Sequence, residues 1–252
     1  MSKSKEPRYE LYYWPGLQGR GEFVRLAFEE AGCPYLEMGR LPATEGGGVR
    51  AIQRMMRGEA GGLRPFAPPI LKYGDLVIAQ TANILAWLAP RLNLVPTDEP
   101  SRIVANQIQL TIMDLVAEVH DTHHPIAASL YYEDQGSEAK RRSEMFVGRR
   151  MPQFLGYFED LLQRNTQSQG KHFLGNTLSY VDLSMFQVLE GLAYAFPQAY
   201  AHVKPSMPRL LELRDHVASR PNIAAYLASP RRIAFNETGI FRRYPELDIE
   251  TA

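Results

Sequence analysis

The sequence predicts a mixed α/β domain followed by an all-helical domain. Short β-type segments separated by turn residues are confined to the first part of the chain, whereas beyond residue 101 apolar residues recur almost throughout at helical spacing. Between them, NLVPTDEPS (93–101) carries prolines and acids and predicts a linker. We therefore place the domains at residues 1–93 and 101–252, and 252 residues suffice to give each domain a core.

Composition and charge exclude several classes of protein. A content of 45% hydrophobic and 22% charged residues is typical of a folded globular chain. The 28 basic and 28 acidic residues cancel, so we expect no nucleic-acid partner and no binding to an anionic membrane. The N-terminal MSKSKEPRYE has no apolar stretch typical of a targeting signal, and no apolar run is long enough to span a membrane. We expect a cytosolic protein, in which the single Cys33 forms no internal disulfide.

The first domain is predicted to begin with a strand, a helix and a second strand. Residues 9–14 (YELYYW) predict the first strand, and PGLQGRG predicts a turn. The apolar residues that follow have helical spacing, and Gly32 can end that helix. We expect the second strand within residues 33–41. Residues 42–67 predict a loop with one irregular helix around Val49 to Met56.

Two adjacent prolines, Pro68 and Pro69, stand directly before a predicted hairpin. Its strands are ILKY and LVIA, joined by a Gly74-Asp75 turn, and Thr81 can cap the helix that follows. Proline cannot donate to a sheet ladder, but it is tolerated at the first residue of a strand, and an X-Pro bond adopts the cis form at low cost. We therefore expect a fixed, buried turn at these prolines.

The second domain is marked by apolar stripes and helix-start signals. The segment LSYVDLSMFQVLEGL has Ser179 as a candidate N-cap and Asp182 three residues later, which predicts a capping box. Pro208 and Pro221 fall where the first turn of a helix tolerates proline. The two clearest stripes are Ile108, Ile112, Leu115, Val116 and Val119, and Phe154, Leu155, Phe158, Leu161 and Leu162.

Three ordered motifs give the chain a resemblance to a known family. YYWPGLQGRGEFVRLAF, PPILKYGDLVIAQTANILAWL and SYVDL resemble the motifs of the cytosolic glutathione transferases, in particular the tyrosine-type sigma, mu and pi classes. The resemblance implies a thioredoxin-like, glutathione-binding N-terminal domain and an all-α C-terminal domain. It further implies a bacterial or fungal-like member with a role in detoxification.

The resemblance implies that Tyr13 is the catalytic residue. Glutathione reacts as the thiolate, which is a minor form of a free thiol at neutral pH, and a tyrosine hydroxyl at the end of the first strand can donate a hydrogen bond to the anion. Strand alternation turns the neighbouring Tyr12 to the other face. On residue type alone, both tyrosines fit strand aromatics that pack a core.

Four further positions correspond to the family's glutathione site. Gln80 and Thr81 stand at a helix start, where free N–H groups favour an anion such as the γ-glutamyl end, although an ordinary helix cap is the alternative. Pro69 corresponds to the family's cis-proline. Pro68 precedes it at the position that normally bonds the cysteinyl backbone of glutathione through both N–H and C=O, and Pro68 has no N–H. We expect either that the carbonyl contact alone is made or that the two prolines mark a variant pocket.

Other residues are assigned by position only. Arg20 corresponds to a glutathione contact or is a solvated charge at a helix end. Asp114 corresponds to an acid that meets glutathione from the partner subunit, which implies a homodimer; a solvated helix edge is the alternative. His124 and Tyr131 correspond to the second substrate pocket. The cluster HDTHHP lacks the Cys or Glu that would complete a ligand set, so we expect no metal.

The predicted function is transfer of the sulfur of glutathione, the co-substrate, to a small-molecule electrophile. A non-catalytic relative that binds glutathione or apolar ligands, or serves as a structural module, is the alternative, because the fold does not separate the two. Cys33 follows the first helix instead of preceding it, so we expect a buried structural thiol and not a nucleophile. The acceptor stays open between conjugation, peroxide reduction and isomerisation. Arg40, Arg50 and Arg54 are the alternatives for the residue that binds the glycine carboxylate.

Overall fold

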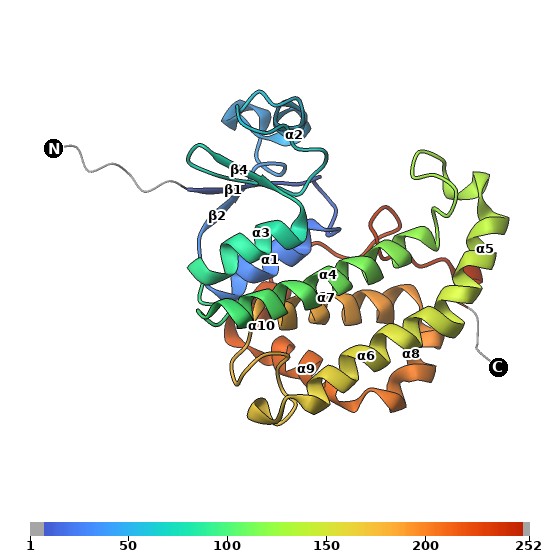
Figure 1. Ribbon diagram of the computed structural model, residues 1–252. Helices are drawn as coiled ribbons and strands as arrows, with labels where there is room; N and C mark the ends of the chain where they lie inside the picture. The colour runs from blue at the N-terminus through green and yellow to red at the C-terminus, as the bar shows by residue number, and fades with distance from the viewer. Residues whose placement is uncertain (1–7, 249–252) are drawn as a thin grey trace.

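The computed structural model describes residues 8–248. The first seven residues, on which the prediction about a targeting signal largely rests, lie outside this range. A small sheet with helices on both faces forms the upper part of the molecule in Figure 1, and a helical bundle lies below it. The strands are β1 (Tyr9–Tyr12), β2 (Tyr35–Glu37), β3 (Ile70–Tyr73) and β4 (Leu76–Ala79). The helices are α1 (Gly21–Glu30), α2 (Gly48–Met56), α3 (Thr81–Leu88), α4 (Glu99–Asp121), α5 (Gly136–Met145), α6 (Met151–Arg164), α7 (Tyr180–Ala195), α8 (Pro197–Val203), α9 (Pro208–Ser219) and α10 (Pro221–Leu227).

The sheet has the order β2-β1-β3-β4. Strand β1 runs parallel to β2 and antiparallel to β3, and the register pairs Tyr12 with Ile70. This register brings the carboxyl end of β1, where Tyr13 follows, beside Pro69. The peptide bond between Pro68 and Pro69 is cis and Pro69 is buried, which confirms the turn expected before the hairpin.

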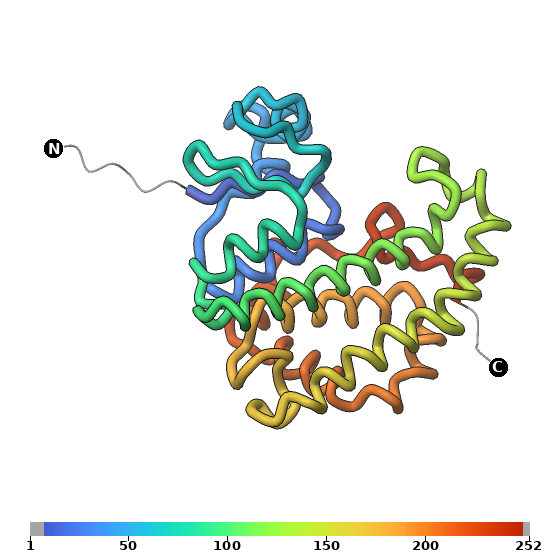
Figure 2. Tube along the Cα trace, in the orientation of Figure 1, coloured from blue at the N-terminus to red at the C-terminus, as the bar shows by residue number. Residues whose placement is uncertain are grey.

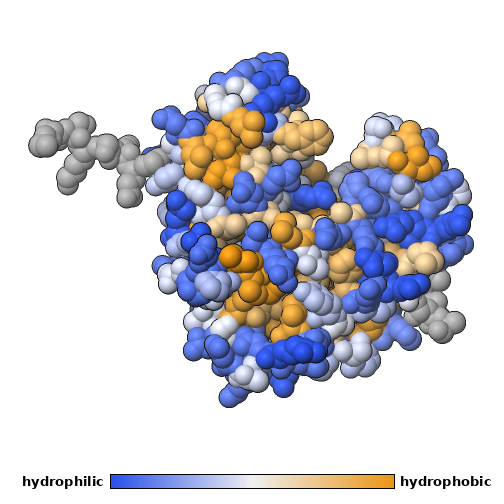
Figure 3. Space-filling model, viewed as in Figure 1, coloured by the Kyte–Doolittle hydropathy of each residue, from blue (hydrophilic) through white to orange (hydrophobic). Residues whose placement is uncertain are grey.

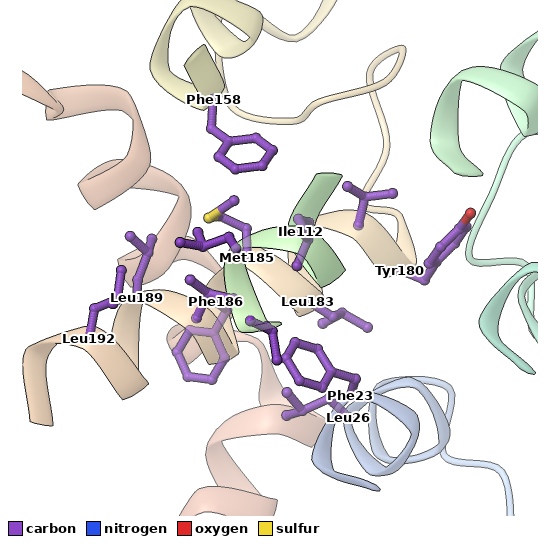
Figure 4. Packing of buried hydrophobic residues seen from close by; sticks show 14 of the residues in the cluster. Phe23, Leu26, Ile112, Phe158, Tyr180, Leu183, Met185, Phe186, Leu189 and Leu192 are labelled. Atoms are coloured by element: carbon purple, nitrogen blue, oxygen red, sulfur yellow. The ribbon is translucent and has the colours of Figure 1, made fainter. Parts of the chain in front are cut away.

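The two faces of the sheet are covered differently. One face packs on α2 through a small cluster that includes Tyr12 and Ile52. The other face packs on α1 and α3, whose apolar residues continue into the core of the helical bundle. Figure 4 shows this junction, where Phe23 from α1 and Ile112 from α4 surround residues of α7 such as Phe186. Helices α1 and α3 therefore join the sheet to the core of the helical bundle.

Helix α7 begins with the predicted capping box. The Asp182 carboxylate accepts hydrogen bonds from the N–H of Ser179 at 2.6 Å, from the Ser179 hydroxyl at 2.7 Å and from the N–H of Phe173 at 2.9 Å. Asp182 and Ser179 are both fully buried. These bonds satisfy donors at a buried helix start, which would otherwise be costly to bury.

Three local predictions differ from the structure. Thr81 does not cap α3, because it is the first helical residue and the N-cap is Gln80, which makes no side-chain cap bond in the described chain. Cys33 is half-buried instead of buried, and partial burial raises the pKa of its thiol. The predicted linker is shorter than 93–101, because Asp98 accepts a hydrogen bond from the Ser101 N–H and α4 begins at Glu99.

The C-terminal segment, residues 228–248, crosses the molecule after α10. In Figure 2 this red segment runs between the blue N-terminal loop and the green α4. Its start is held by Arg40, which donates to the carbonyl oxygens of Arg231 and Pro230, and its end by Asp248, which accepts from the N–H groups of Gln198 and Ala199 in α8. The segment thus connects the sheet-bearing part of the molecule to the far end of the bundle.

Candidate functional site

Tyr13 follows β1 and packs against the turn that leads into α1. Its side chain is buried, and its hydroxyl oxygen accepts a hydrogen bond of 2.8 Å from the N–H of Arg20. Glycine is required at position 21, because a Cβ there would come within 2.6 Å of the Tyr13 ring. The Gly19-Arg20-Gly21 sequence therefore forms the wall against which Tyr13 is held. The hydroxyl proton of Tyr13 is left for a second hydrogen bond, in which the tyrosine is the donor.

The surroundings of Tyr13 keep its hydroxyl protonated. Burial raises the pKa of Tyr13, while the N–H of Arg20 and the charges of Arg20 and Arg25 act in the opposite direction. The guanidinium carbon of Arg25 lies 5.6 Å from the centroid of the Tyr13 ring. The neutral Tyr13 hydroxyl, near the positive charges of Arg20 and Arg25, can donate a hydrogen bond to an anion without losing its own proton.

A pocket of about 420 Å³ opens beside this turn. Arg20 lines it from the start of α1, and Gln80 and Thr81 line it from the start of α3, so two separate sequence motifs contribute to one cavity. The α4 wall was not predicted, although Asn106, Leu110 and Met113 are spaced as one helical face. The full lining is Arg20, Gln80, Thr81, Ala82, Asn83, Ala86, Asn106, Leu110 and Met113.

The N-terminus of α3 is an open helix start. Thr81 is 3% exposed, and its hydroxyl oxygen has no hydrogen-bond partner among residues 8–248. Gln80 has a φ angle of 70°, outside the extended region that N-cap residues usually adopt. The first N–H groups of a helix have no partner within it, and the macrodipole favours an anion there. The pocket wall therefore offers a carboxylate backbone donors and one buried hydroxyl.

The remaining predicted glutathione contacts lie around this pocket and not in its wall. In the described chain, Tyr13, Pro68 and Pro69 do not line it, although the sheet register brings Pro69 beside the end of β1. Asp114 is exposed on α4, directly after Met113, which lines the pocket.

His124 and Tyr131 lie at the far end of α4. His124 accepts a hydrogen bond of 3.1 Å from the Gln135 amide, and Tyr131 is exposed. Neither lines the pocket that contains Thr81, as far as the described residues go. The structure therefore does not bring these two residues together with Arg20, Gln80 and Thr81.

The histidine cluster packs on the C-terminal segment. His120, His123 and His124 have ring centroids 4.8 to 5.2 Å apart, and the Nε2–H of His123 donates to the Ile240 carbonyl oxygen at 2.8 Å. Burial lowers the pKa of His123 to about 3, so the ring is neutral near neutral pH. Within residues 8–248, no group of His, Cys, Asp and Glu is placed to hold a metal ion.

Two of the three arginines considered for the glycine carboxylate are occupied. Arg40 donates to the C-terminal segment, and Arg54 donates to the Gly46 carbonyl oxygen at 3.2 Å. Arg50 is exposed on α2. None of the three lines the pocket that contains Thr81, as far as the described residues go.

Comparison with known proteins points to one family. The model of the glutathione S-transferase C-terminal domain matches residues 120–230. The glutathione S-transferase of Plasmodium falciparum (isolate 3D7) is 24% identical over 229 residues, which cover 89% of this chain and 97% of that protein. Glutathione S-transferase P of Bos taurus is 25% identical over 228 residues, which cover 90% of this chain and 95% of that protein.

Solved structures show the same fold. The Onchocerca volvulus Pi-class glutathione S-transferase superposes with a TM-score of 0.66 at 21% identity, covering 87% of this chain and 91% of that one. The Necator americanus structure described as monomeric Na-GST-3 superposes with a TM-score of 0.64 at 18% identity, covering 90% of this chain and 100% of that one. The chain has the glutathione transferase architecture, a thioredoxin-like domain and an all-α domain. Along most of its length the chain is therefore similar to proteins named glutathione S-transferases.

Proposed function

We propose that this protein is a glutathione transferase that binds glutathione in the pocket at the start of α3 and uses Tyr13 to stabilise the thiolate. The observation that carries the proposal is the open helix start, where the Thr81 hydroxyl is buried and has no partner in the described part of the chain. A buried polar group without a partner costs free energy unless a ligand supplies the bond. A carboxylate of glutathione is such a ligand.

The chain's own groups divide the work of binding and activation. Thr81 and the first N–H groups of α3 hold the γ-glutamyl end, and Arg20, in the same pocket, contributes positive charge. The Pro68 carbonyl accepts from the cysteinyl N–H, and the bond that an N–H at position 68 would add is missing. That missing bond costs about 1 kcal/mol of binding free energy.

The role proposed for Tyr13 is hydrogen-bond donation to sulfur. Glutathione supplies the nucleophilic sulfur, which forms the new bond to the electrophile while the electrophile's leaving group or π electrons accept the displaced pair. Tyr13 keeps its proton, because burial raises its pKa, and the Arg20 N–H fixes the hydroxyl oxygen. Each pKa unit by which the thiol is acidified corresponds to about 1.4 kcal/mol of preferential stabilisation of the thiolate.

One observation favours the non-catalytic alternative. Tyr13 is buried, and the pocket that contains Thr81 does not include it among the described lining residues. A protein that binds glutathione without activating it would have this geometry.

The experiment that separates the two functions uses a matched pair of tyrosine variants. Glutathione binding by calorimetry and thiolate absorbance in the ultraviolet are measured for wild type, Tyr13→Phe and Tyr12→Phe. Tyr12 is the control, because its hydroxyl donates to Glu10 on the face that packs against α2. A transferase binds glutathione in all three and forms thiolate in wild type and Tyr12→Phe only. Binding without thiolate in wild type would establish a non-catalytic glutathione-binding function. No binding would refute the transferase and favour a relative that binds apolar ligands or serves as a structural module.

The proposal includes a homodimer. Phe66 is 90% exposed, and with Leu63 and Leu76 it lines a second cavity beside β4. Figure 3 shows hydrophobic surface gathered over this edge of the sheet-bearing part of the molecule. Exposed apolar surface of this kind is typical of an interface, and a second copy would also bring its Asp114 toward the pocket. Because a structural neighbour is described as monomeric, assembly needs its own test.

Sedimentation velocity provides that test. We expect a dimer for wild type and a shift toward monomer for Phe66→Ser, with Tyr131→Ser, which removes another exposed aromatic side chain, as the control. A monomeric wild type would refute the homodimer and with it the role of Asp114.

The finer expectations belong to the same proposal. These are the tyrosine-type class, the bacterial or fungal-like origin, a small electrophile as acceptor, a role in detoxification, cytoplasmic location and a domain division at residues 1–93 and 101–252. In the described residues no helix is both long and apolar enough to cross a membrane.

A further inference from the structure

Glu22 is the centre of a buried polar network at the start of α1. It is fully buried, and its carboxylate accepts hydrogen bonds from Arg25 at 3.0 Å, from the Tyr226 hydroxyl at 2.7 Å and from Arg232. Arg232 belongs to the C-terminal segment, and its side chain is 10% exposed. Burial would raise the pKa of Glu22, but the charges of Arg232 and Arg25 together with the Tyr226 hydroxyl hold it below its ordinary value.

The network closes a ring around the turn between Tyr13 and Arg20. Arg25 donates to the carbonyl oxygens of Leu17 at 3.2 Å and Gln18 at 3.1 Å. On the other side, Arg232 donates to the Gln187 amide oxygen at 3.0 Å, and Gln187 donates to the side-chain oxygen of Gln18 at 2.8 Å. Gln18 in turn donates to the Ile233 carbonyl oxygen. Arg232 and Ile233 therefore hold the same turn that places the Arg20 N–H on the Tyr13 hydroxyl.

The charges in the network balance only when Arg232 is present. Arg25 also pairs with Glu37 on β2, at 2.6 Å, so two acids face two guanidinium groups. A buried carboxylate that loses one cationic partner is strongly disfavoured. Because Arg25 is shared with Glu37, it cannot replace the partner that Glu22 would lose.

We propose that Arg232 is a positioning residue for the Tyr13 hydroxyl, so that the C-terminal segment completes the catalytic site from the opposite end of the chain. The proposal rests on the function proposed above. Arg232 acts through Glu22, Arg25 and Gln187, and it holds the turn that carries the Arg20 N–H. Without it, the turn is free to move and the hydrogen bond to Tyr13 is weakened.

The test compares Arg232→Gln and Arg232→Lys with Arg231→Gln. Arg231 is the matched control, because its side chain is 59% exposed and pairs with Glu29 instead of Glu22, and its guanidinium carbon lies 5.8 Å from the Tyr226 ring centroid. The first readout is hydrogen exchange of a peptide spanning residues 14–25, measured without glutathione. We expect faster exchange in Arg232→Gln, partial protection in Arg232→Lys, and wild-type protection in Arg231→Gln.

The second readout is the pH titration of the thiolate of bound glutathione. We expect Arg232→Gln to raise the midpoint by about one pH unit and to lower kcat about tenfold with little change in KM, because ordering of the turn affects activation more than binding. If wild type forms no thiolate, the function proposed above fails, and hydrogen exchange still decides whether Arg232 holds the turn.

A double variant separates positioning from charge balance. Glu22→Gln with Arg232→Gln removes both charges, so the fold no longer contains an unpaired carboxylate. If Arg232 only neutralises Glu22, this variant recovers wild-type exchange and titration, which would overturn the proposal. If Arg232 positions the turn, stability recovers while the fast exchange and the raised midpoint persist. Unchanged exchange in Arg232→Gln would also overturn it.

Discussion

The starts of helices α7 and α3 both contain a buried polar side chain, but only one of them is satisfied. At α7, Asp182 accepts three hydrogen bonds from Ser179 and Phe173. At α3, the Thr81 hydroxyl has no partner between residues 8 and 248 and lines a pocket. A helix start that is closed by its own side chains stabilises the fold, whereas an open one retains binding capacity at a cost in stability.

Removing the closed cap has the largest expected effect on stability. Asp182→Ala leaves buried donors of Phe173 and Ser179 without an acceptor, and we expect the free energy of unfolding to fall by about 3 kcal/mol. The measurement is denaturant unfolding. The control is Asp98→Ala at the exposed cap of α4, where water replaces the lost bond to Ser101 and the expected loss is smaller. Equal losses would show that burial of the cap is not the decisive factor.

The side chain of His123 is only partly satisfied, unlike those of Asp182 and Thr81. Its Nε2–H donates to the Ile240 carbonyl oxygen, whereas its buried Nδ1 has no partner in the described chain. Its pKa is lowered from 6.5 to about 3, mainly by burial, so the unfolded chain binds the proton more tightly. The stability that His123 contributes is therefore complete above pH 6.5 and is lost as pH falls toward 3. Between pH 7.5 and 5.5 we expect a loss of about 1.4 kcal/mol.

The variant His123→Gln should lose that part of the pH dependence, and His202→Gln, at an exposed position on α8, should keep it. Unfolding curves recorded across this pH range provide the comparison. A pH profile of His123→Gln that matches wild type would contradict the assignment to His123.

Removing the unpartnered hydroxyl has the smallest expected effect on stability. Thr81→Val keeps the shape of the side chain and removes a group that makes no hydrogen bond within residues 8–248. The free energy of unfolding should therefore change by no more than about 0.5 kcal/mol. A loss of more than about 1 kcal/mol would show that the hydroxyl is satisfied within the protein.

The sequence predicted the closed helix start better than the open one. The Ser179 and Asp182 signal is local, since both residues lie within one turn of α7. The strand, turn and helix order of the first domain and the Pro68-Pro69 turn were also predicted, because spacing and turn chemistry are local properties. Thr81 was wrongly expected to cap α3, because capping depends on the backbone of Gln80, whose φ of 70° is not encoded in the residue type.

Contacts between distant parts of the chain were beyond sequence reasoning. The sequence of the C-terminal segment does not predict that Arg232 pairs with Glu22. The two residues are 210 positions apart, and it is the packing of the segment that brings them together. The α4 wall of the pocket was missed for a related reason: its residues have helical spacing, but their position beside α3 is set by the fold.

The most direct test of the open helix start is calorimetric titration of glutathione into wild type, Thr81→Val and Thr81→Ser. We expect Thr81→Val to bind glutathione about tenfold more weakly at nearly unchanged stability, a loss of about 1.4 kcal/mol for one hydrogen bond to a charged group, while Thr81→Ser keeps wild-type affinity. Equal affinity of Thr81→Val and wild type would contradict the claim that this hydroxyl is reserved for the ligand.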